Sequence, residues 1–152
     1  FTQLVDYNES TYEYKVDFYT PIADVNDISY SDANDYSPIF VLTYGEFSIM
    51  FTGDAGKMGE DELLNGYSKI PQIDVLKVGH HGSSSSSTKE FLNKTTPEYA
   101  AISVGKNNIY SHPSESVVSA LENCGAQVLR TDTDGDITFY VENGKIKTET
   151  EK

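Results

Sequence analysis

The sequence predicts an α/β fold, because apolar runs of strand length alternate with segments of helical pattern. Three of these runs, at residues 47–52, 73–78 and 99–104, contain the β-branched and aromatic residues that favour strands. Glycines follow them at positions 53, 79 and 105, so the runs end 26 residues apart each time. About that length of chain holds one strand, a loop and a returning helix. We therefore expect parallel strands joined by helical crossovers.

Length and composition predict one globular domain over residues 1–152. Of the 152 residues, 38% are hydrophobic, with eleven tyrosines and seven phenylalanines in the chain, which argues against disorder. The formal charge of −13 offers no bulk basic surface of the kind that binds a phosphate backbone. An anionic substrate would therefore have to be held locally, by metal ions. The sequence contains no run of eighteen apolar residues, so we expect no transmembrane helix.

The first third of the chain predicts three strands. Residues 12–18 alternate between polar and apolar side chains, which is typical of an edge or hairpin strand, and an irregular loop is expected at 26–36. The apolar runs at 39–44 and 47–52 are separated only by Gly45-Glu46. This short separation predicts a β-hairpin.

Three helices are expected from residue spacing and capping residues. The segment 60–67 is short and amphipathic, and a second helix should begin at Thr88 as its capping residue. The segment 114–123 has Val117, Val118 and Leu121 on one face. Ser114 could cap its start, and Gly125 stands where a left-handed C-terminal cap would lie.

The last quarter of the chain predicts short strands at 127–130, 136–141 and 145–148, the last two joined by a hairpin turn at 142–144. Residues 132–136 resemble the front of a calcium loop, but the Glu that would complete it is absent, so a polar hairpin turn is the favoured interpretation. The single Cys124 excludes an internal disulfide and is expected to be a buried thiol.

Candidate metal ligands follow the predicted parallel strands. Asp54 comes after the first run, His80 and His81 after the second, and His112 after the third. Loops at the carboxyl ends of neighbouring strands converge on one edge of a sheet, so these side chains can meet. A carboxylate can bridge two divalent ions, and imidazoles hold zinc or manganese. Two such ions can activate a water for attack on a phosphoryl centre. Ser83, Ser111 or a backbone carbonyl could orient the ligands.

Simpler interpretations exist for each residue alone. Asp54 after a glycine is often a turn residue or a helix cap, and His112 before a proline is often a surface loop residue. The serine run 83–87 would by default be a flexible linker, although Ser83 could donate a hydrogen bond to a phosphate oxygen. The adjacent pair His80-His81 is the strongest indication of a site.

The chain resembles the metallo-β-lactamase fold superfamily, and within it the hydrolase domain of ComEC/Rec2-type DNA-uptake proteins. Four strings carry the resemblance: Phe51-Thr52-Gly53-Asp54, Asp74-Val75-Leu76-Lys77-Val78-Gly79-His80-His81-Gly82-Ser83, Asn108-Ile109-Tyr110-Ser111-His112-Pro113 and Arg130-Thr131-Asp132. The resemblance implies a four-layered αβ/βα sandwich with a two-metal site on its open edge. It covers about two thirds of the chain and implies that the chain supplies the second, C-terminal half of that fold.

The resemblance also implies roles for individual residues. Asp54 matches the bridging aspartate, and the last histidine ligand is either in the His80-His81 pair or at His112. By similarity, the distance from Asp54 to His112 suits the ligand, which leaves His80 or His81 to contact phosphate or shuttle a proton. The expected metal set is thus Asp54, His80 and His112, with Zn or Mn, and Ser83 and Asn108 are expected to bind substrate.

One departure from the family pattern limits what this chain can do alone. The His-x-His-x-Asp-His motif, which supplies most ligands of both metals in the family, is absent. We therefore expect the chain to be the C-terminal half of a domain whose N-terminal half lies elsewhere, and Phe1 in place of an initiator Met favours that view. The expected activity is metal-dependent phosphodiester hydrolysis, as in a nuclease, at the cell surface or outside the cell. The alternatives are an inactive binding module of the same fold, or a cell-surface phosphoester hydrolase that does not act on DNA.

Overall fold

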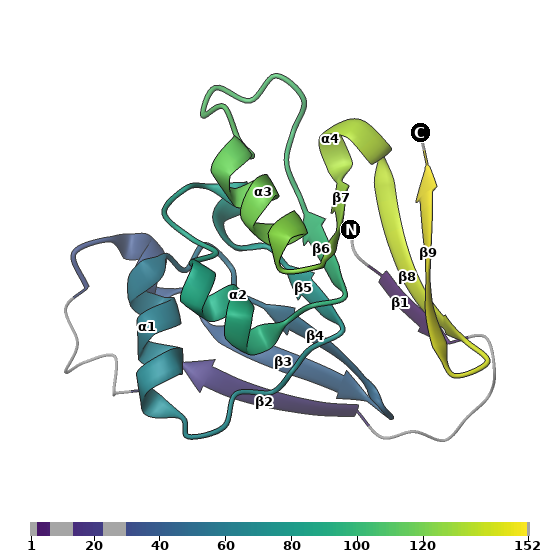
Figure 1. Ribbon diagram of the computed structural model, residues 1–152, viewed down its shortest axis with the longest axis horizontal. Coiled ribbons are helices and arrows are strands. Elements are labelled where there is room, and N and C mark those ends of the chain that lie inside the picture. Colours follow the sequence, from purple (N-terminus) through teal and green to yellow (C-terminus); the bar gives the residue numbers. More distant parts are fainter. Residues whose placement is uncertain (1–2, 7–13, 23–29, 152) are drawn as a thin grey trace.

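A computed structural model describes residues 3–6, 14–22 and 30–151 and contains two β-sheets and a layer of helices (Figure 1). A six-stranded sheet has the order β2-β3-β4-β5-β6-β7, and a three-stranded sheet has the order β1-β8-β9. The strands are β1 (Gln3–Asp6), β2 (Tyr14–Thr20), β3 (Ile39–Tyr44), β4 (Phe47–Phe51), β5 (Val75–Lys77), β6 (Tyr99–Ile102), β7 (Gln127–Arg130), β8 (Asp136–Glu142) and β9 (Lys145–Glu151). The helices are α1 (Lys57–Gly66), α2 (Lys89–Thr95), α3 (Glu115–Asn123), the one-turn α4 (Thr131–Asp134) and the 3₁₀ segments η1 (Ala33–Tyr36) and η2 (Gly79–Gly82).

The large sheet confirms the predicted α/β arrangement. Strands β2, β3 and β4 pair antiparallel, with β3 and β4 joined as the expected hairpin, and β4 to β7 pair parallel. One row of paired residues runs through Met50, Leu76, Ala100 and Val128 without a register shift. The carboxyl ends of β4, β5 and β6 therefore lie side by side at one edge, which is where the predicted site residues follow.

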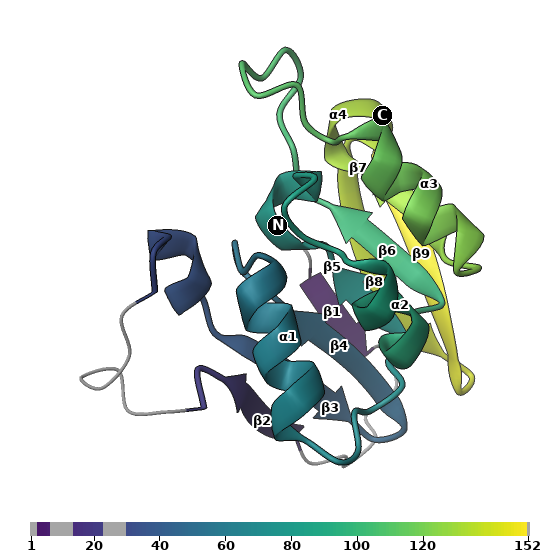
Figure 2. The same cartoon turned by 60° about the vertical axis from the view of Figure 1, so that its left-hand side comes forward.

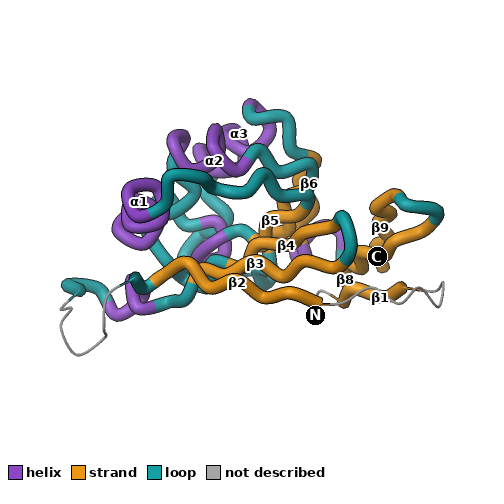
Figure 3. Tube along the Cα trace, turned by 90° about the horizontal axis from the view of Figure 1, so that it is seen from below, coloured by secondary structure: helices purple, strands orange, loops and turns teal. Residues whose placement is uncertain are grey.

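Helices α1, α2 and α3 all lie on one side of the large sheet (Figure 3). Their apolar faces close a core that includes Leu63 of α1, Phe91 of α2 and Leu121 of α3, packed over Met50 and Leu76 of the sheet. A second core lies between the two sheets, where Ile137 and Phe139 of β8 meet residues such as Val75. Val75 and Leu76 point to opposite faces of β5, and burial on both faces explains why both residues are apolar. The described residues thus form three layers, consistent with the metallo-β-lactamase type of sandwich.

Part of the sheet face opposite the helices is not covered by the small sheet. Phe18 of β2, Phe40 of β3 and Phe51 of β4 form a row of rings, with centroids 5.3 and 4.9 Å apart. Phe18 is 66% exposed, and Tyr14 on the same strand is also exposed. An apolar sheet face of this kind is unusual on a free surface.

The strand of residues 12–18 is an edge strand as predicted; its described part starts at Tyr14, and residues 12–13 lie outside the described residues. Of the irregular loop expected at 26–36, residues 26–29 also lie outside them, and the remainder ends in η1.

The helices confirm the predicted positions with one shifted boundary. α1 begins at Lys57, three residues before the expected start at Glu60. The backbone N–H of Gly56 donates to Asp35 Oδ1 at 3.2 Å, and that of Lys57 donates to the Ser85 carbonyl at 2.9 Å. Residues distant in sequence therefore satisfy the first amides of α1, which local pattern cannot reveal.

The capping predictions for the other two helices are confirmed in part. Thr88 caps α2 through its side chain, which accepts a hydrogen bond from the Phe91 N–H. Gly125 ends α3 in a left-handed conformation, with φ +94°, as predicted. Ser114 is the N-cap residue of α3, but its hydroxyl contacts Ser116 Oγ at 2.8 Å instead of capping the helix.

The predicted hairpin turn at 132–136 is wrong. β7 belongs to the large sheet and β8 to the small one, so these strands are not paired, and α4 carries the chain from one sheet to the other. The hairpin between β8 and β9 is present, with Glu142 opposite Lys145. Cys124 is only partly buried, contrary to expectation, and its thiol donates to the Leu121 carbonyl. In the described part of the chain, the helices are too short and too polar to span a membrane.

Candidate metal centre

Two neighbouring loops bring Asp54 and the His80-His81 pair together at the edge of the large sheet. The first loop follows β4 and carries Asp54, whose backbone N–H donates to Ser37 Oγ at 3.1 Å. The second follows β5, and the His80 N–H donates to the Gly53 carbonyl of the first loop at 3.0 Å. Backbone hydrogen bonding thus holds the two loops in fixed relative positions.

His80 and His81 both adopt left-handed backbone conformations, with φ of 47° and 55°. Consecutive non-glycine residues rarely do so, because the side chain approaches its own carbonyl oxygen. Such strained positions concentrate at functional sites. Here the strain turns the two adjacent imidazoles toward different partners.

The His81 imidazole has a defined tautomer and faces Asp54. Its Nδ1 lies 2.7 Å from the carbonyl oxygen of Ser103, and a carbonyl can only accept, so Nδ1 carries the proton. Nε2 then has a free lone pair and lies 3.7 Å from Asp54 Oδ1. A histidine whose second nitrogen donates to a backbone carbonyl is the usual arrangement of a metal ligand.

The His80 ring lies beside the His112 ring, with centroids 5.8 Å apart in an edge-to-face arrangement. His80 Nδ1 is 3.3 Å from Ser85 Oγ. His112 follows β6 in a loop that packs against η2, where the Ser114 N–H donates to the Gly82 carbonyl at 2.8 Å. Burial lowers the pKa of His112, and the nearby His80 and His81 act in the same direction. The structure therefore places His112, a partly exposed loop residue, at the same edge as His80.

The Asn108 side chain organises the loop that carries His112. Its amide nitrogen donates to the His112 carbonyl at 2.7 Å and to the Gly105 carbonyl at 3.1 Å, and its amide oxygen accepts from the His112 N–H at 2.9 Å. Both ends of the amide are therefore engaged within the loop.

The serine run is an ordered loop, and the expectation of a flexible linker is wrong. Ser86 Oγ donates to the Gly79 carbonyl at 2.9 Å, and the buried Glu60 carboxylate accepts from the N–H groups of Ser87 and Thr88 at 2.5 and 2.8 Å. Burial raises the pKa of Glu60, while these hydrogen bonds oppose the rise. Ser83 is buried, and its hydroxyl contacts Ser85 Oγ at 3.0 Å. The ordered serine run therefore contacts His80 through Ser85, whose Oγ lies 3.3 Å from His80 Nδ1.

Asp54 is not the cap of α1, because that position belongs to Gly56 and lacks a side-chain cap. The Asp54 side chain is instead partly exposed, beside a cavity of about 320 Å³ that His80, Lys57 and Met58 also line. Lys77 of β5 supplies positive charge nearby. Burial lowers the pKa of Lys77, and the Asp54 carboxylate acts against that change.

Carboxylate and imidazole groups can both bind divalent metal ions, but the described residues supply only part of a ligand set. They contain no group of three or more His, Cys, Asp or Glu side chains placed to hold an ion. What they provide is two donor pairs, Asp54 with His81 and His80 with His112. The structure brings the four predicted residues to one edge without joining them into a complete ligand set.

The sequence indicated that a backbone carbonyl could orient a ligand, but not that it would be the carbonyl of Ser103. Residue 103 contacts His81 through its backbone carbonyl, which every residue type has, so the amino-acid sequence does not indicate this contact. Thr131, the first residue of α4, accepts from the Val104 N–H and donates to the Val104 carbonyl, both at 2.8 Å. It thereby holds the chain next to Ser103.

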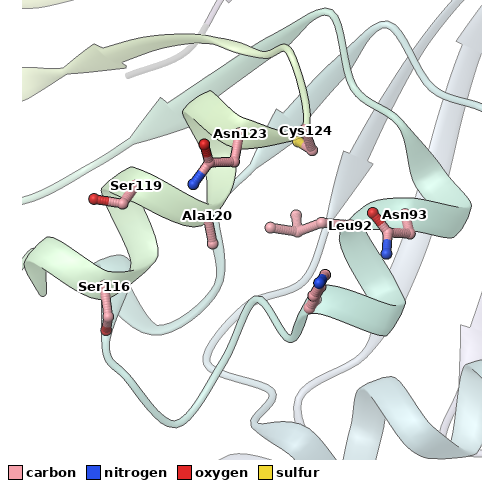
Figure 4. Close-up of a pocket in the computed structure, with 8 residues that line it drawn as sticks. Leu92, Asn93, Ser116, Ser119, Ala120, Asn123 and Cys124 are labelled. Carbon is pink, nitrogen blue, oxygen red and sulfur yellow. The ribbon is translucent and has the colours of Figure 1, made fainter.

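A cavity of about 430 Å³ lies away from this edge. It lies between α2 and α3 and is lined by Leu92, Ser116, Ala120 and Cys124 among others (Figure 4). None of the predicted site residues contributes to it.

Comparison with known proteins identifies the family of this chain. A family model described as "Metallo-beta-lactamase superfamily" matches residues 33–106. Among curated proteins, the chain is 43% identical over 110 residues to ComE operon protein 3 of Bacillus subtilis, covering 72% of this chain and 14% of that protein. It is 38% identical over 116 residues to Competence protein ComA of Neisseria gonorrhoeae, covering 76% of this chain and 17% of that protein.

A third relative is Recombination protein 2 of Haemophilus influenzae, 34% identical over 104 residues, which covers 68% of this chain and 13% of that protein. The chain thus spans less than a fifth of the length of these relatives. The matched segment contains the loops of Asp54 and the His80-His81 pair. On its fold, its donor residues and these matches, the chain belongs to the metallo-β-lactamase superfamily, in its ComEC/Rec2-type branch.

Proposed function

We propose that this chain forms the C-terminal half of a metal-dependent hydrolase that cleaves phosphodiester bonds, as a nuclease or phosphodiesterase does. The observation that carries the proposal is the pair of Asp54 and His81. Their facing atoms are 3.7 Å apart, and the Ser103 carbonyl fixes the His81 tautomer that leaves Nε2 free. Superfamily membership supports a hydrolase fold.

Two divalent ions, zinc or manganese, would supply an activated water and would neutralise charge on the phosphoryl oxygens. In this proposal Asp54, His81 and His112 are the ligands from this chain. His80, expected from the sequence as a ligand or a catalytic group, lies against His112 and Ser85. We assign to His80 the task of contacting a phosphate oxygen or of moving a proton at the leaving oxygen.

Ser83 and Asn108 were expected to bind substrate, and we assign a different task to both. Ser83 is buried behind His80, and Asn108 is engaged in its own loop. We propose that both position the imidazoles, Ser83 through Ser85 and Asn108 through the His112 backbone.

The remaining metal ligands would come from an N-terminal half of the same domain. Three observations support this partner. The sequence lacks the His-x-His-x-Asp-His motif, the described residues form no complete ligand set, and the row of Phe18, Phe40 and Phe51 rings ends in the exposed Phe18. A second β-layer packed on that row would bury it and bring further ligands to the same edge.

The names of the relatives refer to competence and to recombination, which favours DNA as the substrate and a location at the cell surface or outside the cell. The net charge of −13 means that this chain adds no bulk basic surface of its own for DNA. Metal ions and local contacts would therefore have to hold the phosphate.

The test is phosphodiester cleavage by the complete protein that contains this chain. Asp54→Ala should abolish manganese- or zinc-dependent cleavage of a single-stranded oligonucleotide, whereas Asp136→Asn, at an exposed position on β8, should leave it unchanged. Unchanged turnover in Asp54→Ala would remove the basis of the proposal. Metal binding without cleavage of any phosphodiester would favour the non-catalytic binding module, and cleavage of choline-phosphate esters but not DNA would favour the other hydrolase.

A further inference from the structure

A loop between β6 and α3, residues 105–113, stands out from the rest of the molecule beside the candidate metal centre (Figures 1 and 2). Its tip presents two large apolar side chains to solvent. Ile109 is 88% exposed and Tyr110 is 72% exposed. Neither contributes to a core of the described residues, so their exposure is not explained by folding.

The loop is held in one shape although its tip is exposed. The Asn108 amide bridges Gly105 and His112, and the Ser111 N–H donates to the Asn108 carbonyl at 3.4 Å. At its base, Pro113 packs against Gly82 so closely that a Cβ on Gly82 would lie 2.6 Å from the Pro113 Cβ. The tip is therefore presented in a defined place relative to the imidazoles.

Tyr110 stacks on the imidazole of His112. The ring centroids are 5.8 Å apart and the ring planes are inclined by only 20°. The imidazole in turn meets the His80 ring. Tyr110 and His112 thus form a near-parallel pair of rings that extends from His80 toward solvent.

We propose that Tyr110 is a base-stacking subsite, on which a nucleobase next to the scissile phosphate lies when single-stranded nucleic acid binds. The inference rests on the proposed phosphodiesterase function and names its substrate class as nucleotidic. Stacking on an aromatic ring accepts any base, since every base has a π-face. It also requires no positive charge, which suits a chain of net charge −13 whose neighbouring cavity is lined by Asp32, Asp35 and Asp54.

A choline headgroup is the competing ligand for an exposed tyrosine. Quaternary ammonium groups are usually enclosed by a cage of several aromatic rings. The loop contains one such ring, Tyr110, and it lies nearly parallel to its neighbour, as in a stack. The geometry therefore favours a planar ligand.

The experiment adds the complete, metal-loaded protein to one of two oligonucleotides of equal length, one of thymidine and one of abasic residues, both joined by phosphorothioate linkages that resist cleavage. Binding is measured by fluorescence anisotropy. Tyr110→Leu should weaken binding of the thymidine oligonucleotide about tenfold, as expected for loss of one stacked base. The same substitution should leave the affinity for the abasic oligonucleotide unchanged. The Tyr110→Phe variant keeps the ring and should bind both oligonucleotides like the wild type. Ile109→Ser, at the adjacent exposed position, is the matched control and should also bind both like the wild type.

Equal weakening of both oligonucleotides by Tyr110→Leu would overturn the inference, because the ring would then act only by orienting His112. Preference of the wild type for a choline-phosphate ester over both oligonucleotides would overturn it as well. Because binding is measured without turnover, this result is separate from the proposed function. If the thymidine oligonucleotide binds through Tyr110 but no phosphodiester is cleaved, the stacking subsite is supported and the proposed hydrolase function is refuted.

Discussion

Replacement of Gly82 by alanine is the most direct test of how the two histidine loops are held together. Gly82 ends η2 with φ +82°, and the position of its missing Cβ is 2.6 Å from the Pro113 Cβ and 3.2 Å from the Pro113 Cα. Pro113 follows His112, so this contact sets the separation between the His80-His81 turn and the His112 loop. An added methyl group must push the loops apart.

The magnitude follows from two contributions. An L-residue with positive φ costs about 1–2 kcal/mol relative to glycine. Overpacking against a rigid proline ring costs about 1–3 kcal/mol more. Gly82→Ala should therefore lower the free energy of unfolding by about 2–5 kcal/mol.

The matched control is Gly125→Ala. Gly125 also has positive φ, +94°, but nothing lies within 4 Å of the position of its Cβ. It should lose only the conformational contribution of about 1–2 kcal/mol. Urea denaturation of both variants gives the difference, and the NMR signals of the His80 and His112 rings report whether the loops have moved. Equal destabilisation of the two variants, with unchanged histidine signals, would refute the close contact as the element that sets the loop separation.

Three further predictions concern the support and filling of the site. Asp132 accepts two hydrogen bonds from the Arg130 guanidinium, at 3.0 and 2.7 Å, which lowers the pKa of Asp132. Because the pKa is lower in the folded state, the pair stabilises the fold above the unfolded pKa, and this is lost as pH falls through the folded pKa. Asp132→Asn should thus cost about 1–2 kcal/mol at neutral pH and progressively less below a pH of about 4, measured by urea denaturation at several pH values. Thr131→Val removes both hydrogen bonds to the buried Val104 backbone and should cost about 1–3 kcal/mol, whereas the same change at the exposed Thr133 should be nearly neutral. Removal of metal by a chelator should lower the melting temperature of the complete protein. At a free metal concentration of 100 times Kd, bound metal adds about 2.7 kcal/mol to the free energy of unfolding, and the chelator removes this amount. An unchanged melting temperature would contradict a metal that joins the loops.

Local sequence patterns predicted the elements whose formation depends on neighbouring residues. The strand runs, the Thr88 cap, the Gly125 cap and the hairpin between β8 and β9 are all present. Each of these depends on side-chain periodicity or on a residue with a special backbone preference. Both can be read without knowledge of the partner segment.

Errors occurred where a distant partner decides the conformation. The start of α1 depends on Asp35 and on the Ser85 carbonyl, and the serine run is ordered by Glu60, 27 residues before Ser87. The turn expected at 132–136 instead connects two different sheets. No local pattern states which sheet a strand will join, because strand pairing is settled by burial of both faces.

The sequence by itself determined the chemistry available to this protein. One aspartate and three histidines follow three strands, and parallel pairing alone is enough to bring such residues to one edge. Only the tertiary structure decided which imidazole faces Asp54, because that depends on the Ser103 carbonyl, a group that every residue type possesses. It also decided that the Tyr110 ring lies nearly parallel to the His112 ring, since the loop shape comes from the hydrogen bonds of the Asn108 side chain and from the contact of Pro113 with Gly82.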